Sequence, residues 1–324
     1  MATMQDIADE VGISKAAVSR ILNKKGSFSK KTIEQVLKSA KRLQYRLPSD
    51  LQLLEDEDLK IIAAVFPLMD NIYFSVLSSL LEQAAYNYGY SLMICSSIYD
   101  QEKEEVFFSM LRERKINGII YGSFTEGISL ESEEDLPIVT IGTKISDTVP
   151  TVRSDNYSAG VIAARHLASN GAKDLLYISD YHEGKNKDER YKGFKDEANK
   201  LDINVSSYFT YHNNQSKDVA GIITQMLIDH PEADGIFAEH TSLAIQCLKI
   251  CNDLGLEVPK DLKLVGFSSP YASNYSFPEI SNVMENTRMI AEKAIGTLVD
   301  LIENNTVKEL ETIVPVSLER KQTS

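Results

Sequence analysis

Apolar residues recur with a helical period near the start of the chain. The first set follows the i, i+3, i+4, i+7 spacing of an amphipathic helix, with members Met4, Ile7, Ala8 and Val11. Gly12 is suited to end that helix in a left-handed turn, and Ser14 is a typical N-cap for a second one. A third helix begins at Ser29 and turns inward the apolar residues Ile33, Val36, Leu37, Ala40 and Leu43. The pattern predicts a small three-helix domain.

From about Leu59 the pattern changes to short apolar runs that alternate with helical stretches. Runs that predict strands are KIIAAVFP, SLMICSS, GIIYGS, PIVTIGT, DLLYISD, ADGIFAE and LKLVGFS. Helical periods cover 73–88, 102–114, 158–170, 190–201, 219–230, 241–254 and 287–304. Strands that alternate with helices are typical of parallel βαβ units, so we expect an α/β body with a doubly wound parallel sheet.

Composition narrows the class of protein. The 324 residues are 43% hydrophobic and 25% charged, as in ordinary globular proteins. No apolar run reaches the length of about 18 residues that a membrane span needs. The first residues lack the pattern of a signal peptide, and three cysteines give no disulfide framework. We therefore expect a cytoplasmic protein with no membrane association.

Charge is distributed unevenly along the chain. The formal net charge is −13, yet residues 1–46 hold ten Lys and Arg against four acidic residues, which gives +6. The remaining residues therefore carry −19. A basic head on an acidic body indicates a module that binds a polyanion, joined to a part that does not.

The second helix of the head has two distinct faces. At about 100° per residue, one arc of the helix is apolar and carries Ala17, Val18, Ile21 and Leu22. The opposite arc is small and cationic and carries Lys15, Ala16, Ser19 and Arg20. A recognition helix needs such residues in its first turn, where it reaches base edges in the major groove. The alternative is a merely solvated helix face, but the helix–Gly–helix spacing in a basic segment favours DNA binding.

These residues resemble the DNA-binding head of the lactose/galactose-repressor family. The resemblance runs through MQDIADEVGISKAAVSRILNKKGSFSKKTIEQVLKSAKRLQYR. Within the family, this segment is similar to sugar-operon repressors of Gram-positive bacteria, such as sucrose-operon regulators. It implies that Lys15, Ala16 and Arg20 read bases, the cations at guanine and Ala16 at a thymine methyl group. It also implies that Ser14, Ser19 and Asn23 help to fix the backbone, although Ser19 and Asn23 are equally consistent with solvated helix positions.

The segment after Tyr45 departs from the family. The family continues with a short basic helix that wedges a leucine into the minor groove, and Leu54 stands at that place here. The usual alanine is Leu51, and the basic residues are replaced by the acidic run 55–58. Carboxylates near phosphates repel, so either this run lies beyond the DNA or the hinge docks differently. We favour the first alternative.

The resemblance extends over the body, through stretches such as VRSDNYSAGVIAARHLASNGAKDLLYIS and ERYKGFKDE. It implies two α/β lobes like those of periplasmic sugar-binding proteins. We expect a helix-turn-helix head at 1–46, a hinge at 47–58 and an effector-binding and dimerisation body at 59–324. The first lobe would comprise about 59–156 and 286–315, and the second about 157–285 and 316–324. A ligand is expected in the cleft between the lobes.

The family's effector positions match only in part. Tyr73 and Phe74 correspond to aromatic residues that pack on the ligand, although one of them is equally a core residue. Arg190 corresponds to the arginine that contacts the effector, with an ordinary surface arginine as the alternative. Two aspartates that hold sugar hydroxyls are replaced by Gly142 and Ser268. The sequence therefore favours a less hydroxylated or anionic effector, such as a sugar phosphate. A neutral sugar remains the alternative, because polar side chains are still expected near the site: Ser123, Asn186, His240 and Ser268.

The sequence thus predicts a transcriptional repressor of a carbohydrate-utilisation operon, which binds a pseudo-palindromic operator as a homodimer. The sequence has no heptad repeat of the kind that joins two dimers into a tetramer, so we expect a dimer. One alternative is a catabolite-type regulator whose corepressor is a phosphorylated carrier protein. A sugar-binding protein without a regulatory role is less consistent with the basic head. The chain has no dinucleotide, phosphate-loop or hydrolase motif, so we expect no enzyme and no cofactor. The i, i+4 pair Cys247 and Cys251 is more typical of a core than of a metal site.

Overall fold

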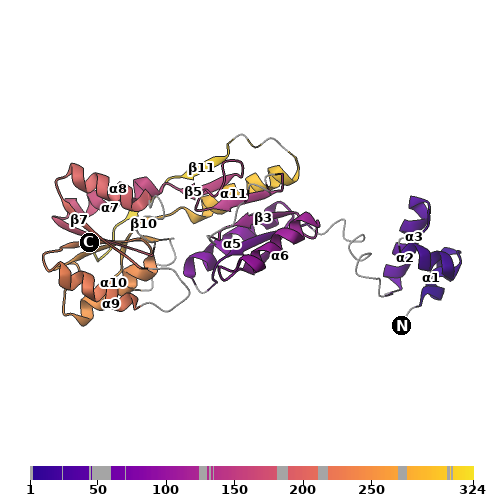
Figure 1. The fold of residues 1–324 in the computed structure, drawn as a ribbon, viewed down its shortest axis with the longest axis horizontal. Coiled ribbons are helices and arrows are strands. Elements are labelled where there is room, and N and C mark those ends of the chain that lie inside the picture. Colours follow the sequence, from indigo (N-terminus) through magenta and orange to yellow (C-terminus); the bar gives the residue numbers. More distant parts are fainter. Residues whose placement is uncertain are drawn as a thin grey trace. The chain divides into compact units, whose positions relative to one another are not determined.

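The computed structural model describes residues 3–23, 25–43, 45, 60–69, 71–123, 130, 133, 135–180, 189–210, 218–268, 276–304, 307 and 309–324. The chain forms two compact units, Met1–Lys60 and Ile61–Ser324, which we call the head and the body (Figure 1). The predicted hinge at 47–58, including Leu54 and the acidic run, lies outside the described residues. The predicted division between head and hinge therefore stays a prediction.

In the described residues of the head the chain forms three helices, α1 (Met4–Val11), α2 (Lys15–Leu22) and α3 (Lys30–Arg42). They share one core made of the buried residues Ile7, Ala8, Val18, Ile21, Leu22, Val36 and Ala40. The predicted helix ends are confirmed. Thr3 and Asp6 form a reciprocal capping box at the start of α1, and Gly12 ends it at a φ of 75°. Ser29 precedes α3, where its hydroxyl accepts a hydrogen bond from the Thr32 N–H at 3.1 Å.

The body contains two six-stranded sheets. The first has the order β11-β5-β4-β3-β1-β2, and all its strand pairs are parallel. The second has the order β12-β10-β9-β8-β6-β7 and is parallel except for the antiparallel edge strand β12. The first sheet comprises β1 (Ile61–Phe66), β2 (Ser91–Ser96), β3 (Gly118–Tyr121), β4 (Ile138–Ile141), β5 (Thr151–Ser154) and β11 (Glu311–Val314). The second comprises β6 (Asp174–Ser179), β7 (Asn204–Phe209), β8 (Gly235–Ala238), β9 (Lys263–Ser268), β10 (Ser281–Met284) and β12 (Ser317–Glu319).

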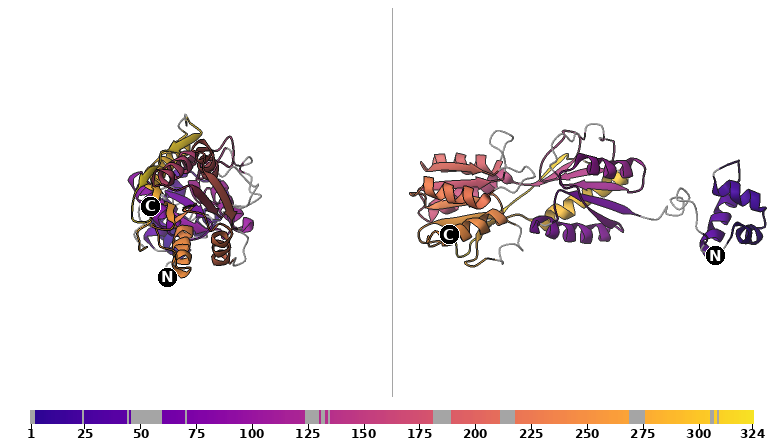
Figure 2. Two further views of the ribbon diagram at one scale, coloured as in Figure 1. Left: turned by 90° about the vertical axis from the view of Figure 1, so that its left-hand side faces the viewer. Right: turned by 60° about the horizontal axis from the view of Figure 1, so that its bottom comes forward.

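Helices cover both faces of each sheet, which confirms the predicted pair of doubly wound lobes (Figures 1 and 2). On the first sheet, α5 (Ile72–Asn87) and α11 (Thr287–Ile302) share one core, and α6 (Gln101–Arg112) packs on the other side. On the second sheet, α7 (Asn156–Ser169) and α8 (Glu189–Lys200) share one core. The helices α9 (Val219–Asp229) and α10 (Thr241–Asp253) share the other. We call the layers around these sheets the first and second lobes.

The chain passes between the lobes three times. It leaves β5 at Ser154 and enters α7 at Asn156, and it leaves β10 at Met284 and enters α11 at Thr287. The third passage joins β11 to β12 through Pro315. These connections place polar side chains at the carboxyl ends of several parallel strands, where open α/β sheets usually bind ligands.

Candidate functional sites

The second helix of the head presents its two predicted faces. Its first turn is capped, because the Ala17 N–H donates to Ser14 Oγ at 3.1 Å. Its apolar face lies in the core through Val18, Ile21 and Leu22. Lys15, Ala16 and Arg20 are exposed on the other side, and neither cation pairs with a described acidic residue. The helix therefore offers cationic donors and a methyl group that are free to reach base edges.

Ser19 and Asn23 interact with each other at the end of α2. The Asn23 side-chain amide donates to the Ser19 carbonyl oxygen at 2.7 Å, and it lies 3.4 Å from Ser19 Oγ. Asn23 is exposed and Ser19 is half-buried. Asn23 thus caps the helix, so its predicted phosphate contact would come from a side chain that the helix end already holds in place.

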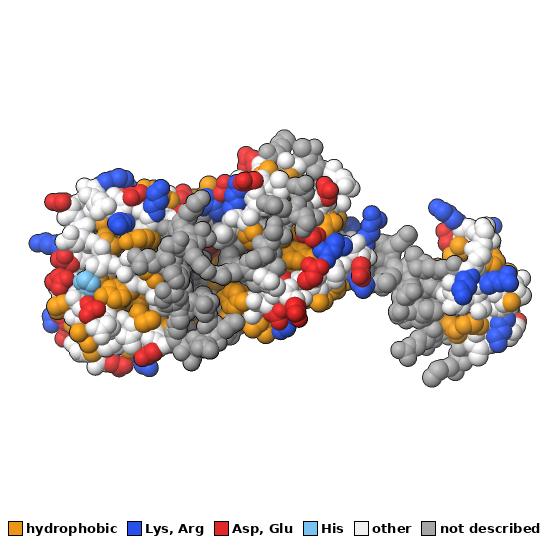
Figure 3. All heavy atoms as spheres, viewed as in Figure 1, with side chains coloured by type: hydrophobic (Ala, Val, Ile, Leu, Met, Phe, Trp, Pro, Cys, Tyr) orange, Lys and Arg blue, Asp and Glu red, His pale blue; other side chains and the backbone are white. Residues whose placement is uncertain are grey.

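The charges visible at the surface differ between the two units. Figure 3 shows Lys and Arg side chains gathered over the described surface of the head, whereas acidic and basic side chains are mixed over the body. This distribution agrees with the +6 of residues 1–46 and the −19 of the rest of the chain. The excess of positive charge in the head suits contact with the phosphates of DNA.

In the second lobe, the helix that carries Arg190 crosses its neighbour at two glycines. A Cβ added to Gly160 of α7 would lie 2.0 Å from the Arg190 carbonyl oxygen. A Cβ added to Gly193 of α8 would lie 2.0 Å from the Tyr157 carbonyl oxygen. Only glycine permits two helix backbones to approach so closely. The contact with α7 therefore fixes the position of the start of α8. The glycine of the ERYKGF motif thereby helps to set the position of its arginine.

Arg190 is held by protein groups on several sides. Its Nε donates to Asn156 Oδ1 at 2.8 Å, and one terminal nitrogen donates to the Glu239 carbonyl oxygen at 2.8 Å. The same nitrogen lies 3.6 Å from the Glu239 carboxylate. The guanidinium stacks 3.8 Å above the centre of the Phe267 ring. Arg190 is therefore an ordered, partly buried cation at the strand ends of the second lobe rather than a surface arginine.

A second buried carboxyl group connects the two lobes. Glu285, just after β10, accepts hydrogen bonds from Ser154 Oγ at 2.6 Å and from Thr287 Oγ1 at 3.3 Å. It also hydrogen-bonds with Tyr73 of α5. Burial raises the pKa of Glu285, while Ser154, Arg190, Tyr73 and Thr287 act against this rise. Burial and the neighbouring Glu285 also raise the pKa of Tyr73 well above its usual value.

His240 forms a pair with Asp180 close to Arg190 and Glu239. The Leu243 N–H donates to His240 Nδ1 at 3.3 Å, which leaves Nε2 as the protonated nitrogen that donates to Asp180 Oδ2 at 2.6 Å. The other oxygen of Asp180 accepts from the Thr210 hydroxyl. Burial lowers the pKa of His240, but Asp180 and Glu239 outweigh burial and raise it overall. Asp180 and Glu239 thus favour protonation of His240, whereas the hydrogen bond from the Leu243 N–H to Nδ1 is made only by the neutral ring.

The remaining predicted effector residues divide into three groups. Phe74 is a core residue, 8% exposed and 5.0 Å from the Phe66 ring, so of the two aromatic residues Tyr73 is the one at the polar cluster. Ser123 is buried in the first lobe, where its hydroxyl lies 3.2 Å from that of Ser97. Asn186 lies outside the described residues, and Ser268 is described only as the last residue of β9.

The structure also places three carboxyl groups beside Tyr73, Arg190 and His240, and the sequence pattern did not single out any of the three. Asp180, Glu239 and Glu285 each directly follow a strand of the second sheet. Ser179 Oγ donates to the Glu239 carboxylate at 2.5 Å, and so does the Asp180 N–H at 3.0 Å. Their position at carboxyl ends of parallel strands was the signal that could have found them. We call these three acids, with Tyr73, Arg190 and His240, the polar cluster.

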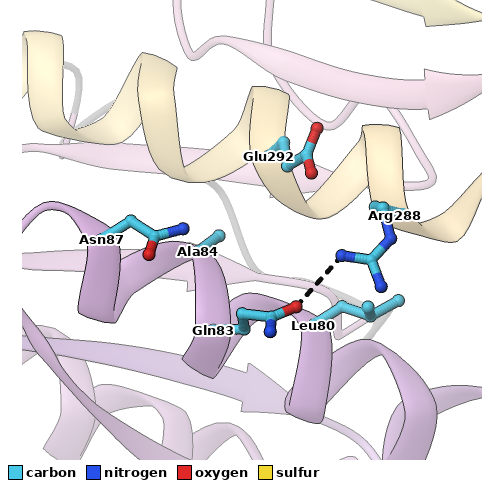
Figure 4. Close-up of a pocket in the computed structure, with 6 residues that line it drawn as sticks. All are labelled: Leu80, Gln83, Ala84, Asn87, Arg288 and Glu292. Atoms are coloured by element: carbon cyan, nitrogen blue, oxygen red, sulfur yellow. Dashed lines mark hydrogen bonds between the residues drawn. The ribbon is translucent and has the colours of Figure 1, made fainter.

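A separate pocket of about 210 Å³ lies on the first lobe between α5 and α11 (Figure 4). Arg288 donates to Gln83 Oε1 at 3.0 Å across it, and Glu292 lies on the same side as Arg288. Its lining thus combines one cation with one acid. No residue predicted for DNA or effector contacts lines this pocket.

Two classes of site have no counterpart in the part of the chain that the structure describes. There, no helix is long and apolar enough to cross a membrane. No group of three or more His, Cys, Asp or Glu side chains in the same part is arranged to hold a metal ion. Cys247 and Cys251 are buried, and burial raises the pKa of the Cys251 thiol to about 11.

Comparison with known proteins decides the family. The family model "Bacterial regulatory proteins, lacI family" matches residues 3–47, which include all three helices of the head. The chain belongs to the lacI family. A "Periplasmic binding protein-like domain" matches residues 164–324 of the body. This lacI-family chain is therefore a DNA-binding transcriptional regulator with a periplasmic-binding-protein-like domain, and not an enzyme.

Relatives of this lacI-family regulator extend over almost its whole length. The sucrose operon repressor of Streptococcus mutans is 27% identical over 318 residues, 98% of each chain. The ribose operon repressor of Halalkalibacterium halodurans is 27% identical and covers 100% of this chain and 97% of its own. A solved lacI-type regulator of Alkaliphilus metalliredigens, complexed with D-xylulofuranose, is 25% identical with a TM-score of 0.69. That match covers 82% of this chain and 99% of the other.

Proposed function

We propose that this regulator represses an operon for carbohydrate use. Its affinity for operator DNA falls or rises when a sugar binds between its lobes. The arrangement of Arg190 carries the proposal. A partly buried guanidinium, an imidazole, a phenol and three carboxyl groups lie together at strand ends next to the passages between the lobes. Such a set provides directional donors and acceptors for several hydroxyl groups at once. The names of the sucrose and ribose operon repressors support the same ligand class.

We further propose a neutral sugar, rather than a sugar phosphate, as the effector. The sequence favoured an anion because Gly142 and Ser268 replace two expected carboxylates. The polar cluster, however, contains three carboxyl groups against one guanidinium and one imidazole. A phosphate would have to lie beside these acids, whereas carboxylates are natural acceptors for sugar hydroxyls. Lys144, which lies two residues after Gly142, is already paired with Asp147 Oδ1 at 2.6 Å.

A homodimer on a pseudo-palindromic operator completes the proposal. One head reads only a half-site, so two-fold protein symmetry matches a two-fold operator. Large apolar side chains are exposed on the first lobe, including the edge strand β2: Tyr86, Tyr88, Ile94, Ile98 and Val106. A surface of this kind is consistent with contact to a second copy. We place the protein in the cytoplasm, where its DNA target lies.

The catabolite-type alternative receives no specific support from the face of the body drawn in Figure 3. A phosphorylated carrier protein would require a cationic docking patch on the body. Acidic and basic side chains are mixed there (Figure 3), and the pocket between α5 and α11 combines Arg288 with Glu292. The sugar-controlled repressor therefore remains the proposed function.

A thermal-shift panel tests the effector proposal on the full-length protein. Neutral sugars, including sucrose and D-ribose, are compared with their phosphates, because a ligand that binds the native state raises the unfolding temperature. We expect a neutral sugar to raise it, and Arg190→Gln to abolish the rise. Arg165→Gln is the matched control, since Arg165 is an exposed arginine paired with Glu197 of α8. A larger shift with a phosphate than with any neutral sugar would contradict the proposed ligand class.

A further inference from the structure

Arg153 of β5 forms two ion pairs that differ in kind. Its Nε donates to Glu311 Oε1 at 2.6 Å, and Glu311 lies on β11, the neighbouring strand of the same sheet. A terminal nitrogen donates to Glu189 Oε2 at 2.5 Å, and Glu189 is the first residue of α8, which packs on the other sheet. The Arg153 guanidinium therefore joins the two lobes, and its partner Glu189 directly precedes Arg190 in the sequence.

The exposure of the three side chains makes one pair releasable. Arg153 is only 14% exposed, whereas Glu189 is 39% exposed and Glu311 is 34% exposed. If the lobes separate, Glu189 can be hydrated while Arg153 keeps Glu311 as its partner. Opening then leaves no unpaired buried charge, which is what makes loss of a buried ion pair costly. The guanidinium fork suits this arrangement because it can hold two carboxylates at once.

The contact with Glu189 bears on the helix that carries Arg190. The glycine crossing at Gly160 and Gly193 fixes α8 against α7, so a force on the first residue of α8 acts on both helices. Three residues after Arg153, the chain enters α7 of the second lobe at Asn156, whose side chain accepts a hydrogen bond from Arg190. The short segment 153–156 thus contacts two consecutive residues of α8: Arg153 pairs with Glu189, and Asn156 hydrogen-bonds with Arg190.

We propose that Arg153 is a positioning residue, a latch that holds the first lobe against the helix bearing the effector arginine. The Arg153–Glu189 pair closes with the lobes and opens with them, while the Arg153–Glu311 pair persists in both states. The inference rests on the proposed function only for the role of Arg190. The latch itself exists or fails without reference to DNA or sugar.

Hydrogen exchange of the full-length protein, without added sugar, tests the latch. The variants are Arg153→Gln, Glu189→Gln and the double variant. The control is Glu279→Gln, which removes a carboxylate paired with Lys321 beside the second sheet. The informative amide is that of Asp155, which donates to the Val314 carbonyl oxygen at 2.9 Å where the chain leaves the first lobe. Circular dichroism verifies that each variant is folded.

Each single variant should speed exchange at this amide and in the first turn of α8, by about two- to fivefold for a partly exposed ion pair. The double variant should exchange no faster than Arg153→Gln, because Glu189→Gln removes only an interaction that Arg153→Gln already removes. Added salt should speed exchange in the parent protein but not in the double variant. Additive effects, a change confined to α8, no change, or the same change in Glu279→Gln would overturn the proposal. Thermal-shift results with sugars do not enter this test, so the two proposals fail independently.

Discussion

Replacing Gly193 with alanine should destabilise the body and displace the effector arginine. The added Cβ would lie 2.0 Å from the Tyr157 carbonyl oxygen and 2.9 Å from its carbon, whereas real Cβ atoms essentially never approach closer than 3.0 Å. The obstacle is helix backbone, which cannot rotate away as a side chain would. α7 and α8 would therefore have to separate by about 1 Å, as the difference of these distances requires.

The magnitude follows from two opposing effects. Overpacking of this kind costs about 3 kcal/mol at the upper end of its usual range, while alanine is favoured over glycine in a helix by about 1 kcal/mol. The net loss of about 2 kcal/mol should lower the unfolding temperature by about 4–8 °C for a domain of this size. The separation should also break the hydrogen bond from Arg190 to Asn156, now 2.8 Å long.

Thermal unfolding followed by circular dichroism measures the effect, with Gly296→Ala in α11 as the matched control. A Cβ at Gly296 would meet only the Tyr88 hydroxyl at 3.5 Å, an ordinary contact. That variant should therefore be as stable as the parent protein or slightly more stable, because alanine favours the helix. If Gly193→Ala unfolds at the same temperature as the parent protein, the reasoning from the helix crossing is refuted.

Three further predictions concern the head and the polar cluster. Lys15→Ala or Arg20→Ala should each weaken operator binding by about 1–3 kcal/mol at a direct base contact, measured by fluorescence anisotropy; equal losses on random DNA would show phosphate contacts instead. Ser14→Ala should destabilise the head by about 1 kcal/mol through loss of its cap, seen as faster hydrogen exchange in α2; unchanged exchange would contradict this. The pKa of His240 is raised above its ordinary 6.5 in the folded protein, so its pairing with Asp180 stabilises the body below that pH and is lost as pH rises through the folded-state pKa. As pH rises through this range, the unfolding temperature of His240→Gln should fall less than that of the parent protein. The same fall in both proteins would show that the His240–Asp180 pair is not the cause of the lost stability.

The sequence pattern located the helices well because each has a clear apolar face and a definite start. The pattern placed a helix at 287–304, and α11 spans Thr287–Ile302, where Asn286 caps it through the Met289 N–H. Strong apolar runs likewise located seven strands, all of them in the sheets as predicted. Buried parallel strands are nearly continuous in hydrophobicity, so these runs stand out.

Five strands escaped the pattern because they are short or lie at sheet edges. β7, β11 and β12 are edge strands with partly exposed residues, so their sequences lack a continuous apolar run. β5 contains Arg153, whose charge only makes sense once Glu189 and Glu311 are beside it. β10 contains Asn282, which is buried in the second sheet and donates to the Ile280 carbonyl oxygen at 2.7 Å. Tertiary contacts, not local pattern, decide these segments.

The candidate sites were predictable to different degrees. The faces of α2 follow from helical periodicity alone, so Lys15 and Arg20 were placed correctly on the exposed side. Arg190 was found through a motif, but the residues that hold it come from distant parts of the chain. Glu239 and Glu285 are 49 and 95 positions further along, and a single sequence gives no sign that they converge. Their charges are what change the expected effector from an anion to a neutral sugar.

The central claim is that a sugar in the body controls DNA binding by the head. The most direct test is fluorescence anisotropy of a labelled operator fragment, selected from genomic DNA, titrated with the protein in the presence and absence of the neutral sugar that stabilises it. We predict a change in operator affinity of about 5- to 150-fold, which Arg190→Gln abolishes while it retains DNA binding. Operator affinity that is the same with and without the bound sugar would contradict the account.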